Sequence, residues 1–436
     1  MLPALTRRLA LVLLAVAGLR LVLPESLPGG VWGINAVIAL LVVLDIVLAP
    51  SPRSFEIGRQ LPDQVALRAT AEVALVVRNQ HRRAVSISLA DELAPSLRAG
   101  TRRWRVRVPG RSEVRLSTTI HPGRRGRFEP SRVVLRAEGP LGLGARQRTI
   151  EVPGRLKVVP AFPSRKDAEL RLARAKRLEL GVRSVRMLGT GTDFDQLREY
   201  TPDDDFRRID WAATARGGRP IVRMYRAERN QTVLVLVEVG RNMAGRVAGV
   251  PRLEHALDAV FALTTVATGL QDQVGLVAYD DQIRASLAPS HRADQLAHVV
   301  EAVYELEPEL LETDHLSAFS HTLARFRRRT TLVVCTDLTE ATVTETLLPA
   351  LPLVLRDHLV VIVAVTDPEV AAWAAERVTD DDGLYRRAAA TGALEERARL
   401  AARLRGLGAL VVDAPPGQVA SRLVDVYLTA RWGGRL

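Results

Sequence analysis

Two apolar runs near the N-terminus place the strongest constraint on how this chain folds. Leu9–Leu23 is interrupted only by Arg20, and Val31–Ala49 carries a single charge, Asp45. A helix needs about 20 consecutive apolar residues to cross a bilayer, so the second run is long enough. The first run reaches this length if the Arg20 side chain extends to the headgroups. Because the backbone in a bilayer must satisfy its own hydrogen bonds, both runs are predicted to be helices.

The charges that flank these runs predict a transmembrane hairpin. The turn over residues 24–30 contains no Lys or Arg, whereas arginines precede the first run and follow the second, at Arg7, Arg8, Arg53 and Arg59. Positively charged flanks remain on the cytoplasmic side of a membrane. Both ends of the hairpin are therefore expected to face the cytoplasm, together with the rest of the chain.

A cleaved signal peptide is the alternative interpretation of the first run. Arg7 and Arg8 would form its basic region, and Ala15-Val16-Ala17 would form its cleavage site. Its apolar core would then be only Leu9–Leu14, which is shorter than the roughly 7 residues that such signals need. Residues 1–52 are therefore predicted to form an uncleaved hairpin anchor.

Between about Phe55 and Pro160 the apolar residues recur with a period of two. In Trp104–Val108, for example, they alternate with arginines, and the Pro109-Gly110 turn follows. Short runs of this kind between turns are typical of antiparallel strands with one solvated face. About seven such strands in roughly 100 residues predict an immunoglobulin-like β-sandwich over residues 53–163. The segment Gly139–Leu143 is predicted to be a turn that needs glycine dihedral angles.

The positive charge of the chain is concentrated in the same segment. The net charge is +12, and residues 51–160 alone hold 22 Arg and Lys against 9 Asp and Glu. The hairpin would place this segment beneath the inner leaflet, where anionic lipid attracts basic residues. The alternative is a merely solvated basic face. Nucleic acid is not an expected partner, because aromatic residues for base stacking are not interleaved with the arginines. The candidates for lipid contact are Arg102, Arg103, Arg105, Arg107, Arg124, Arg125 and Arg127.

After residue 230 short β-rich runs alternate with helical stretches. This alternation predicts a doubly wound α/β domain with a mostly parallel sheet and helices on both faces. We assign residues 231–436 to this domain, and residues 164–230 to a connector helix followed by a segment rich in special residues. The expected strands are Thr232–Val239, Val274–Tyr279, Thr331–Thr336, Leu359–Thr366 and Ala409–Val412.

The segment Gly189–Arg216 is denser in glycines, aromatic residues and charges than an amphipathic face requires. Its matching residues are Gly189, Gly191, Phe194, Leu197, Arg198, Tyr200, Asp204, Arg207, Ile209, Asp210, Trp211, Ala215 and Arg216. Through them it resembles the signature of a bacterial family called domain of unknown function 58, which has glycine where this chain has Asp203. Members of that family are commonly encoded beside MoxR-type AAA+ ATPases. The resemblance therefore implies such a partner and a place in the bacterial cytoplasmic membrane.

We expect this segment to brace the α/β domain and to present an edge to a partner. Asp203 is predicted to cap a short helix that contains Phe206 and Ala213, because Asp is a preferred helix N-cap. Trp211 is expected to anchor the segment in the core. The acidic run Asp203–Asp205 lacks the ligand spacing of an EF-hand, so calcium is not expected. The binding residues implied by the resemblance are Gly189, Gly191, Phe194, Arg198, Tyr200, Asp204, Arg207, Asp210, Trp211 and Arg216.

The α/β half resembles von Willebrand factor A domains, whose first strand ends in Asp-x-Ser-x-Ser and holds a divalent cation. The corresponding residues are Glu238, Gly240 and Asn242, while Thr313 and Asp337 match the two later ligands. Mg²⁺ requires oxygen ligands in near-octahedral geometry, and Gly240 supplies no side-chain ligand. The degenerate set of Glu238, Asn242, Thr313 and Asp337 is therefore expected to bind Mg²⁺ weakly or not at all.

No arrangement of residues in the sequence points to catalysis. No phosphate-loop lysine follows Gly191, His255 and His315 have no partners at zinc-ligand spacing, and no nucleophile elbow occurs. The single cysteine, Cys335, lies in an apolar run and is expected to be buried and inert. We therefore expect a non-enzymatic, membrane-anchored adaptor or assembly factor without a cofactor. The alternative is a metal-dependent ligand-binding receptor that uses the degenerate site.

Overall fold

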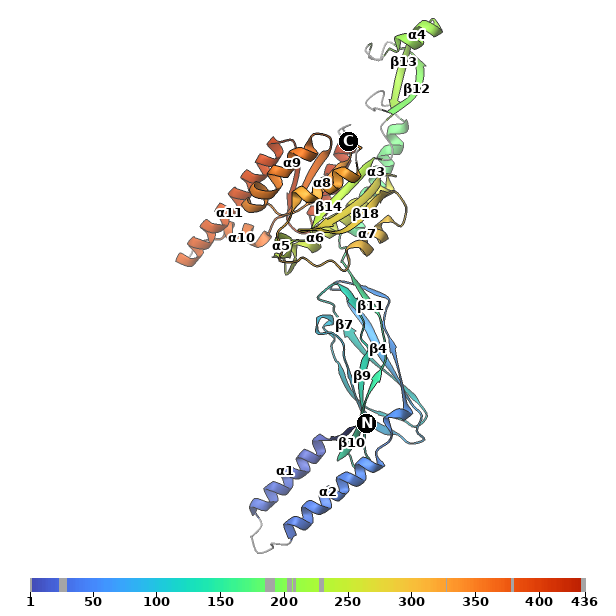
Figure 1. Ribbon diagram of the computed structural model, residues 1–436, viewed down its shortest axis with the longest axis vertical. Helices are drawn as coiled ribbons and strands as arrows, with labels where there is room; N and C mark the ends of the chain where they lie inside the picture. Colours follow the sequence, from blue (N-terminus) through green and yellow to red (C-terminus); the bar gives the residue numbers. More distant parts are fainter. Residues whose placement is uncertain are drawn as a thin grey trace. The chain divides into compact units, whose positions relative to one another are not determined.

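The computed structural model describes residues 2–22, 30–184, 193–201, 206, 209–226, 231–326, 328–377 and 380–432. The chain divides into two compact units, Met1–Val159 and Pro160–Leu436 (Figure 1). The first unit holds one apolar core between β-sheets, and the second holds two apolar cores on either side of one sheet.

The first unit begins with a short strand and two helices. β1 (Leu2–Leu5) is followed by α1 (Arg7–Val22) and α2 (Gly30–Leu48). The segment Gly33–Ser54 has a mean hydropathy of 2.3 and is long and apolar enough to cross a membrane. Its apolar side chains are largely exposed, with Leu40 at 67%, which distinguishes α2 from the core helix of a soluble protein. α1 is shorter, with 16 residues, and its span of the membrane stays a prediction.

A β-sandwich follows the helices. Its larger sheet has the order β1-β10-β9-β5-β6, and it faces the sheet β2-β4-β7; a small sheet β3-β11-β8 adjoins them. The core between the two faces contains Leu75 and Val77 from one sheet and Ile87 and Leu135 from the other. The strands are β2 (Phe55–Gln60), β3 (Gln64–Ala66), β4 (Ala71–Asn79), β5 (Val85–Asp91), β6 (Arg103–Val108), β7 (Glu113–Ile120), β8 (Gly126–Phe128), β9 (Arg132–Glu138), β10 (Gly144–Glu151) and β11 (Leu156–Val159), with 3₁₀ turns at Pro52–Ser54 and Pro95–Leu97.

The N-terminal strand β1 was not predicted from the sequence. It pairs antiparallel with β10, and Leu5 lies opposite Gly144. The chain that precedes α1 therefore belongs to the same sheet as the sandwich that follows α2. Consequently, the beginning of α1 and the end of α2 both lie at the sandwich.

The second unit is built on a six-stranded sheet with the order β18-β17-β14-β19-β20-β21. Only the edge strand β18 is antiparallel, so the predicted mostly parallel sheet is confirmed. The sequence analysis did not anticipate β18, whose side chains are partly exposed. The strands are β14 (Thr232–Glu238), β17 (Gln273–Tyr279), β18 (Ile283–Ser290), β19 (Thr331–Cys335), β20 (Leu359–Val365) and β21 (Leu410–Ala414), and Arg246–Val247 and Val250–Pro251 form the short pair β15 and β16.

Helices cover both faces of this sheet. Along β14, Val235 belongs to the core on one face, with α3, α6, α7 and α12, and Leu236 belongs to the core on the other face, with α8, α9 and α11. A strand buried on both faces is apolar at every position, as Val233–Val237 is in β14. The helices are α3 (Arg165–Ser184), α5 (Arg241–Ala244), α6 (Arg252–Gly269), α7 (Gln295–Val303), α8 (His315–Arg325), the π-helical turn η4 (Ala341–Leu347), α9 (Leu348–Leu355), α10 (Pro368–Ala375), α11 (Asp381–Gly406) and α12 (Val419–Trp432).

The segment that carries the family signature forms a small antiparallel pair of strands. β12 (Asp193–Glu199) pairs with β13 (Ile221–Arg226), and α4 (Trp211–Gly217) lies between them in sequence. α3, predicted as a connector helix, packs into the α/β core through Ala168 and Ala175. Leu172 of α3 also lies so close to Gly269 of α6 that a Cβ there would be 2.5 Å away. α3 is thus part of the second unit.

Candidate functional site

The carboxyl end of β14 holds a buried carboxylate. Glu238 is the last residue of that strand and is fully buried. Its Oε1 accepts hydrogen bonds from Asn242 Nδ2 at 2.9 Å and Thr313 Oγ1 at 2.7 Å, and its Oε2 accepts one from Thr336 Oγ1. Burial raises the pKa of Glu238, while these three hydrogen bonds act in the opposite direction and the charge of Asp337 adds to the increase.

Gly240 makes this arrangement sterically feasible. A Cβ at this position would lie 2.3 Å from Thr313 Oγ1 and 2.9 Å from the carbonyl oxygen of Leu311. Thr313 therefore occupies the space that a serine side chain would need. In the sequence analysis, Gly240 stood at the position of a metal-binding serine and supplied no ligand. In the structure, the absence of a side chain at Gly240 lets Thr313 reach Glu238.

The neighbouring carboxylate, Asp337, is paired with two arginines. Its Oδ1 lies 2.7 Å from Arg397 Nη1, and its Oδ2 lies 2.7 Å from Arg252 Nη1. Arg397 also forms a two-fold hydrogen bond with Asp413, at 2.8 Å from Nε and 2.8 Å from Nη2. Burial lowers the pKa of Arg397, but the hydrogen bonds and charges of Asp413 and Asp337 outweigh it and raise the pKa.

The two parts of the crevice are linked into one network. Besides pairing with Asp337, Arg252 donates from Nη1 to the carbonyl oxygen of Asn242 at 3.0 Å, and the Asn242 side chain in turn donates to Glu238. Guanidinium groups thus provide the positive charge next to Asp337. Among the described residues, no cluster of three or more His, Cys, Asp or Glu side chains could hold a metal ion.

A pocket opens beside this network. Its volume is about 210 Å³. Polar residues from several elements line it, namely Arg252, Thr339, Thr366, Asp367, Glu396 and Arg397. The strand order reverses at β14, with β17 and β19 on its two sides, and ligands of open α/β sheets bind outside the carboxyl ends of the strands at such a switch point. The pocket and the network therefore lie where this class of fold binds its ligands.

The structure thus brings together three of the four residues of the predicted metal set. Asn242 and Thr313 both contact Glu238, whereas Asp337 pairs with Arg252 and Arg397. The sequence analysis missed the roles of Arg252, Arg397 and Thr336. Arg397 stands among the many charges of α11, and nothing in that local pattern distinguishes it from a solvated residue.

The second predicted site is the signature segment, of which the structure describes a part. Gly189, Gly191, Asp204 and Arg207 lie outside the described residues, as do Asp203 and Asp205. The backbone of Phe194 pairs with Tyr225 in the two-stranded sheet. The Tyr200 N–H donates to the carbonyl oxygen of Pro220, and Arg198 Nη1 donates to Thr201 Oγ1 at 3.4 Å. Arg216 is exposed in the last turn of α4.

Asp210, and not the predicted Asp203, caps the helix of this segment. α4 begins at Trp211, and the Asp210 carboxylate accepts hydrogen bonds from the N–H groups of Ala212 and Ala213, both at 3.0 Å. Phe206 lies outside this helix. An Asp at an N-cap also stabilises the positive end of the helix dipole. The Ile-Asp-Trp motif is therefore a helix start rather than the middle of a helix.

Trp211 is not the core anchor that the sequence predicted. Its side chain is 61% exposed, and Phe206 is 63% exposed. The two rings pack edge to face with their centroids 5.6 Å apart. An aromatic pair of this kind on a surface is a typical anchor for a protein partner, because Trp is enriched at interaction hot spots.

A third set of residues joins α2 to the sandwich. The carboxylate of Asp45 is buried and accepts hydrogen bonds from the N–H groups of Leu141, Leu143 and Gly144 at 2.7, 2.7 and 2.8 Å. A Cβ on Gly139 would lie 2.4 Å from Asp45 Cγ. The predicted Gly139–Leu143 turn is therefore a socket for the only charge of the apolar run, and Gly142, at φ +70°, is its left-handed residue.

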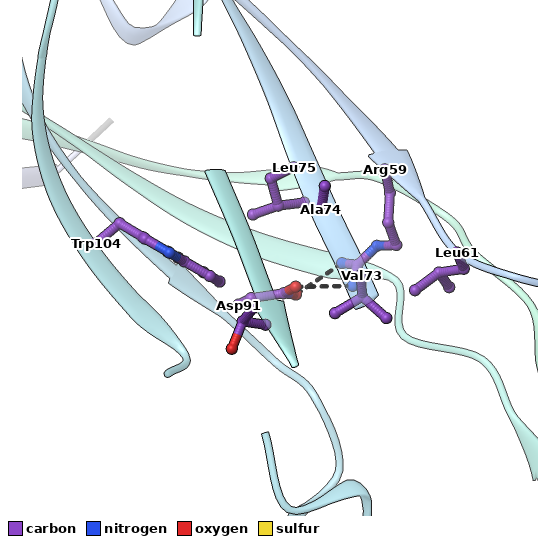
Figure 2. Close-up of a pocket in the computed structure, with 8 residues that line it drawn as sticks. Arg59, Leu61, Val73, Ala74, Leu75, Asp91 and Trp104 are labelled. Carbon is purple, nitrogen blue, oxygen red and sulfur yellow. Dashed lines mark hydrogen bonds and ion pairs between the residues drawn. The ribbon is translucent and has the colours of Figure 1, made fainter. Parts of the chain in front are cut away.

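A buried ion pair in the sandwich corrects the prediction for Arg59. This residue was expected to flank the membrane, but its side chain is 1% exposed and its Nη2 lies 2.8 Å from Asp91 Oδ1. Figure 2 shows the two groups facing each other beside Trp104 and Leu61. Burial raises the pKa of Asp91, and the charge of Arg59 partly offsets this. The pair fills the gap between the sheets and leaves no room for a ligand.

The fold and the crevice define a protein with an α/β domain in which Asp337, Arg252, Arg397 and Asp413 of the crevice are paired with one another. A comparison with family models then gives a match to the family described as "Protein of unknown function DUF58" over residues 196–376. The match begins within β12 of the signature segment and extends through the α/β unit to the end of α10. It supports the family resemblance that the signature residues indicated.

Curated relatives match over a short region. Uncharacterized protein Rv1480 of Mycobacterium tuberculosis and Uncharacterized protein Mb1516 of Mycobacterium bovis are each 32% identical to this chain over 87 residues. The matched region is 20% of this chain and 27% of each relative. The chain thus spans about a quarter of the length of these relatives.

Two solved structures to which the chain is similar each cover about a quarter of it. The crystal structure of the CARDB domain of the PF1109 protein from Pyrococcus furiosus, in complex with di-metal ions, has a TM-score of 0.16 and 17% identity, covering 23% of this chain and 85% of that chain. A protein of unknown function from Porphyromonas gingivalis W83 has a TM-score of 0.19 and 18% identity, covering 26% of this chain and 50% of that chain.

Proposed function

We propose that this protein is a non-enzymatic adaptor or assembly factor, anchored in the bacterial cytoplasmic membrane, whose α/β unit binds other proteins in the cytoplasm. The partner that the family resemblance implies is a MoxR-type AAA+ ATPase. The α/β unit is taken as a von Willebrand A-like domain, because its strand order reverses at β14 and its crevice lies at the carboxyl end of that strand.

The observation that carries the proposal is the pairing of Asp337 with Arg252 and Arg397. In a metal-dependent receptor the crevice needs free oxygen ligands for a cation. Here Asp337 contacts two guanidinium groups at 2.7 Å, and Glu238 already accepts three hydrogen bonds. A cation would have to displace these partners. The arrangement favours a preformed protein-binding surface over a metal-dependent receptor, and a magnesium ion is not part of the proposed function.

The sandwich supports an anchor that crosses the membrane twice. β1 pairs with β10 before α1 begins, and Asp45 is held in the Gly139–Leu143 socket as α2 ends. If α2 spans the bilayer, α1 must span it as well. The start of α1 and the end of α2 are both attached to one sandwich, so the chain must leave and return to the same side. Arginines at Arg7, Arg8 and Arg53 favour the cytoplasm as that side.

The exposed aromatic pair is the surface that we assign to the partner. A photo-crosslinking amino acid in place of Trp211, in the full-length protein in its native membrane, should capture an AAA+ ATPase that mass spectrometry identifies. Tyr385, which is 75% exposed on α11, is the matched control position and should not capture it. Recovery of no ATPase from position 211, or equal recovery from both positions, contradicts the proposed partnership.

A further inference from the structure

One end of the sandwich carries arginines that come from segments far apart in the sequence. We call them the membrane-end arginines, and they are Arg7, Arg8, Arg53, Arg82, Arg83 and Arg111. All six are exposed. Within the described part of the chain none of them forms an ion pair that balances its charge.

Direct contacts attach the loop after β4 to the exit of α2. Ser54 follows α2 by six residues, and its carbonyl oxygen accepts a hydrogen bond from the N–H of Gln80 at 3.0 Å. The ring of Phe55 packs on that of His81, with centroids 6.2 Å apart. Arg82 and Arg83 are the next two residues. The end of α2 and this loop are therefore neighbours at the same end of the sandwich.

A second loop is fastened to the first. The buried Asn79 side chain donates from Nδ2 to the carbonyl oxygens of Arg83 at 3.0 Å and Pro109 at 2.9 Å. The N–H of Arg111 donates to the carbonyl oxygen of His81 at 2.8 Å. A Cβ on Gly110 would lie 2.1 Å from the carbonyl oxygen of Arg82, so glycine is needed for this approach. The turn between β6 and β7 thus joins the same surface.

The strand register places most of the arginines chosen from the sequence elsewhere. Arg103 lies opposite Ala90, near the end of β5 that is remote from the loop at Arg82. Arg124 and Arg127 lie after Ile120, which pairs with Ala71 at the start of β4, so they are at the far end too. Arg125 is buried, with 4% exposure. In the proposed anchor arrangement these four residues would not face the leaflet, whereas Arg107, which lies opposite Ser86, is close to the membrane end.

We propose that the membrane-end arginines bind the phosphate groups of anionic phospholipids and so hold the sandwich against the leaflet. This inference rests on the proposed anchoring through α2. A guanidinium group donates hydrogen bonds to phosphate oxygens in a forked geometry. The exposed acidic side chains near this end are Glu56, which lies 3.9 Å from Arg78, and Glu113. Two buried carboxylates also lie there: Glu138 pairs with Arg105 at 2.8 Å, and Asp45 accepts three backbone hydrogen bonds. The six exposed arginines exceed these four carboxylates, so the surface is positively charged.

The test uses the full-length protein in lipid nanodiscs with a fluorescent probe at position 84. Ala84 is exposed beside Arg83, and the native Cys335 is buried, so a thiol label on Ala84→Cys is selective. Quenching by a lipid that carries a quencher on its headgroup reports the distance to the leaflet. A probe on Ser131→Cys, at the far end before β9, is the matched control.

We expect the probe at 84 to be quenched more than the probe at 131, and more strongly in discs with phosphatidylglycerol than in purely zwitterionic discs. Salt at about 0.5 M should remove the dependence on anionic lipid, because it screens exposed charges. Arg82→Glu together with Arg83→Glu should abolish it as well. The equal charge change at the far end, Arg103→Glu with Arg132→Glu, should leave it intact.

The outcomes separate the inference from the anchor on which it rests. Equal quenching at 84 and 131 contradicts the proposed anchor arrangement. Stronger quenching at 84 that is the same in both lipid types overturns the arginine proposal and leaves the anchor standing. If the double Glu variant unfolds, as judged by its thermal transition, Arg82→Gln with Arg83→Gln provides the same test and should reduce the dependence on anionic lipid.

Discussion

Arg252 and Arg397 of the α/β unit, with side chains 16% and 14% exposed, each lie 2.7 Å from a carboxylate oxygen of Asp337. In the sandwich unit, Arg82 and Arg83 stand in exposed loops at the end next to α2. The same side chain therefore serves as an internal counter-ion in one unit and as an external charge in the other. A buried charge must be paired because desolvation is costly, whereas an exposed charge is stabilised by water and remains available to a ligand.

The largest effect is expected from removing an internal counter-ion. Arg397→Met leaves Asp337 and Asp413 without their shared guanidinium group, and breaking a buried pair in this way costs about 3–5 kcal/mol. Denaturant unfolding of the full-length protein measures the loss. Arg403→Met, at an exposed position of the same helix, is the control and should change little. A loss below about 1 kcal/mol for Arg397→Met would show that the network does not stabilise the crevice.

Acid should destabilise the α/β unit through His315. This imidazole lies between Tyr279 and Phe319, and burial lowers its pKa from 6.5 to about 4. The unfolded state therefore binds more protons than the folded state between these pH values, so the free energy of unfolding falls as pH decreases from 6.5 towards 4. The loss is about 3 kcal/mol.

Unfolding measured across this pH range tests the role of His315. His315→Phe should remove most of the slope, whereas His291→Gln, at an exposed position, should not. An unchanged slope in His315→Phe would assign the acid sensitivity to other groups.

A variant of Asp45 tests whether burial decides the role of a charge in either unit, because Asp45 is a buried charge of the sandwich unit. Asp45→Ala leaves the N–H groups of Leu141, Leu143 and Gly144 without their acceptor. An unsatisfied buried group costs about 1–3 kcal/mol, so we expect the α2 junction to loosen and proteolysis in the Gly139–Leu143 turn to become faster. Asp63→Ala, at an exposed site in the same unit, should not have this effect. Equal proteolysis of both variants would contradict the socket.

A smaller effect on stability is expected at Trp211. Because its ring is 61% exposed, Trp211→Ala should lower the free energy of unfolding by less than about 1 kcal/mol, in contrast to about 3–5 kcal/mol for a buried Trp. Its effect should instead appear as loss of the ATPase that co-purifies with the full-length protein. A large loss of stability would mean that the signature segment is buried against another part of the protein.

The smallest effect on folding is expected at the membrane end. Arg82→Gln together with Arg83→Gln removes two exposed charges and should change the free energy of unfolding by no more than about 0.5 kcal/mol. Calorimetry in neutral detergent measures this. A loss comparable to that of Arg397→Met would remove the distinction between the internal and the external arginines.

Local pattern was sufficient to predict most of the elements of the fold. The continuously apolar run Val233–Val237 lies in a strand buried on both faces, and the alternating run Trp104–Val108 lies in a sandwich strand. Cys335 is buried as predicted, and burial raises its pKa to about 12. These outcomes follow from side-chain periodicity, which is a property of neighbouring residues. β18 was missed because its weak alternation at an edge resembles a loop.

The sequence by itself determined most of the elements and the apolar helix α2, because these follow from local periodicity and hydropathy. The grouping of Asn242 and Thr313 with Glu238 was implied by the resemblance to von Willebrand factor A domains. Only the tertiary structure decided which charges are internal. Arg59 and Arg125 are buried although their neighbours suggested a solvated surface, while Trp211 is exposed although its type suggested the core. The physical reason is that burial and pairing depend on segments that the fold brings together, such as α11 with β19, which no local pattern specifies.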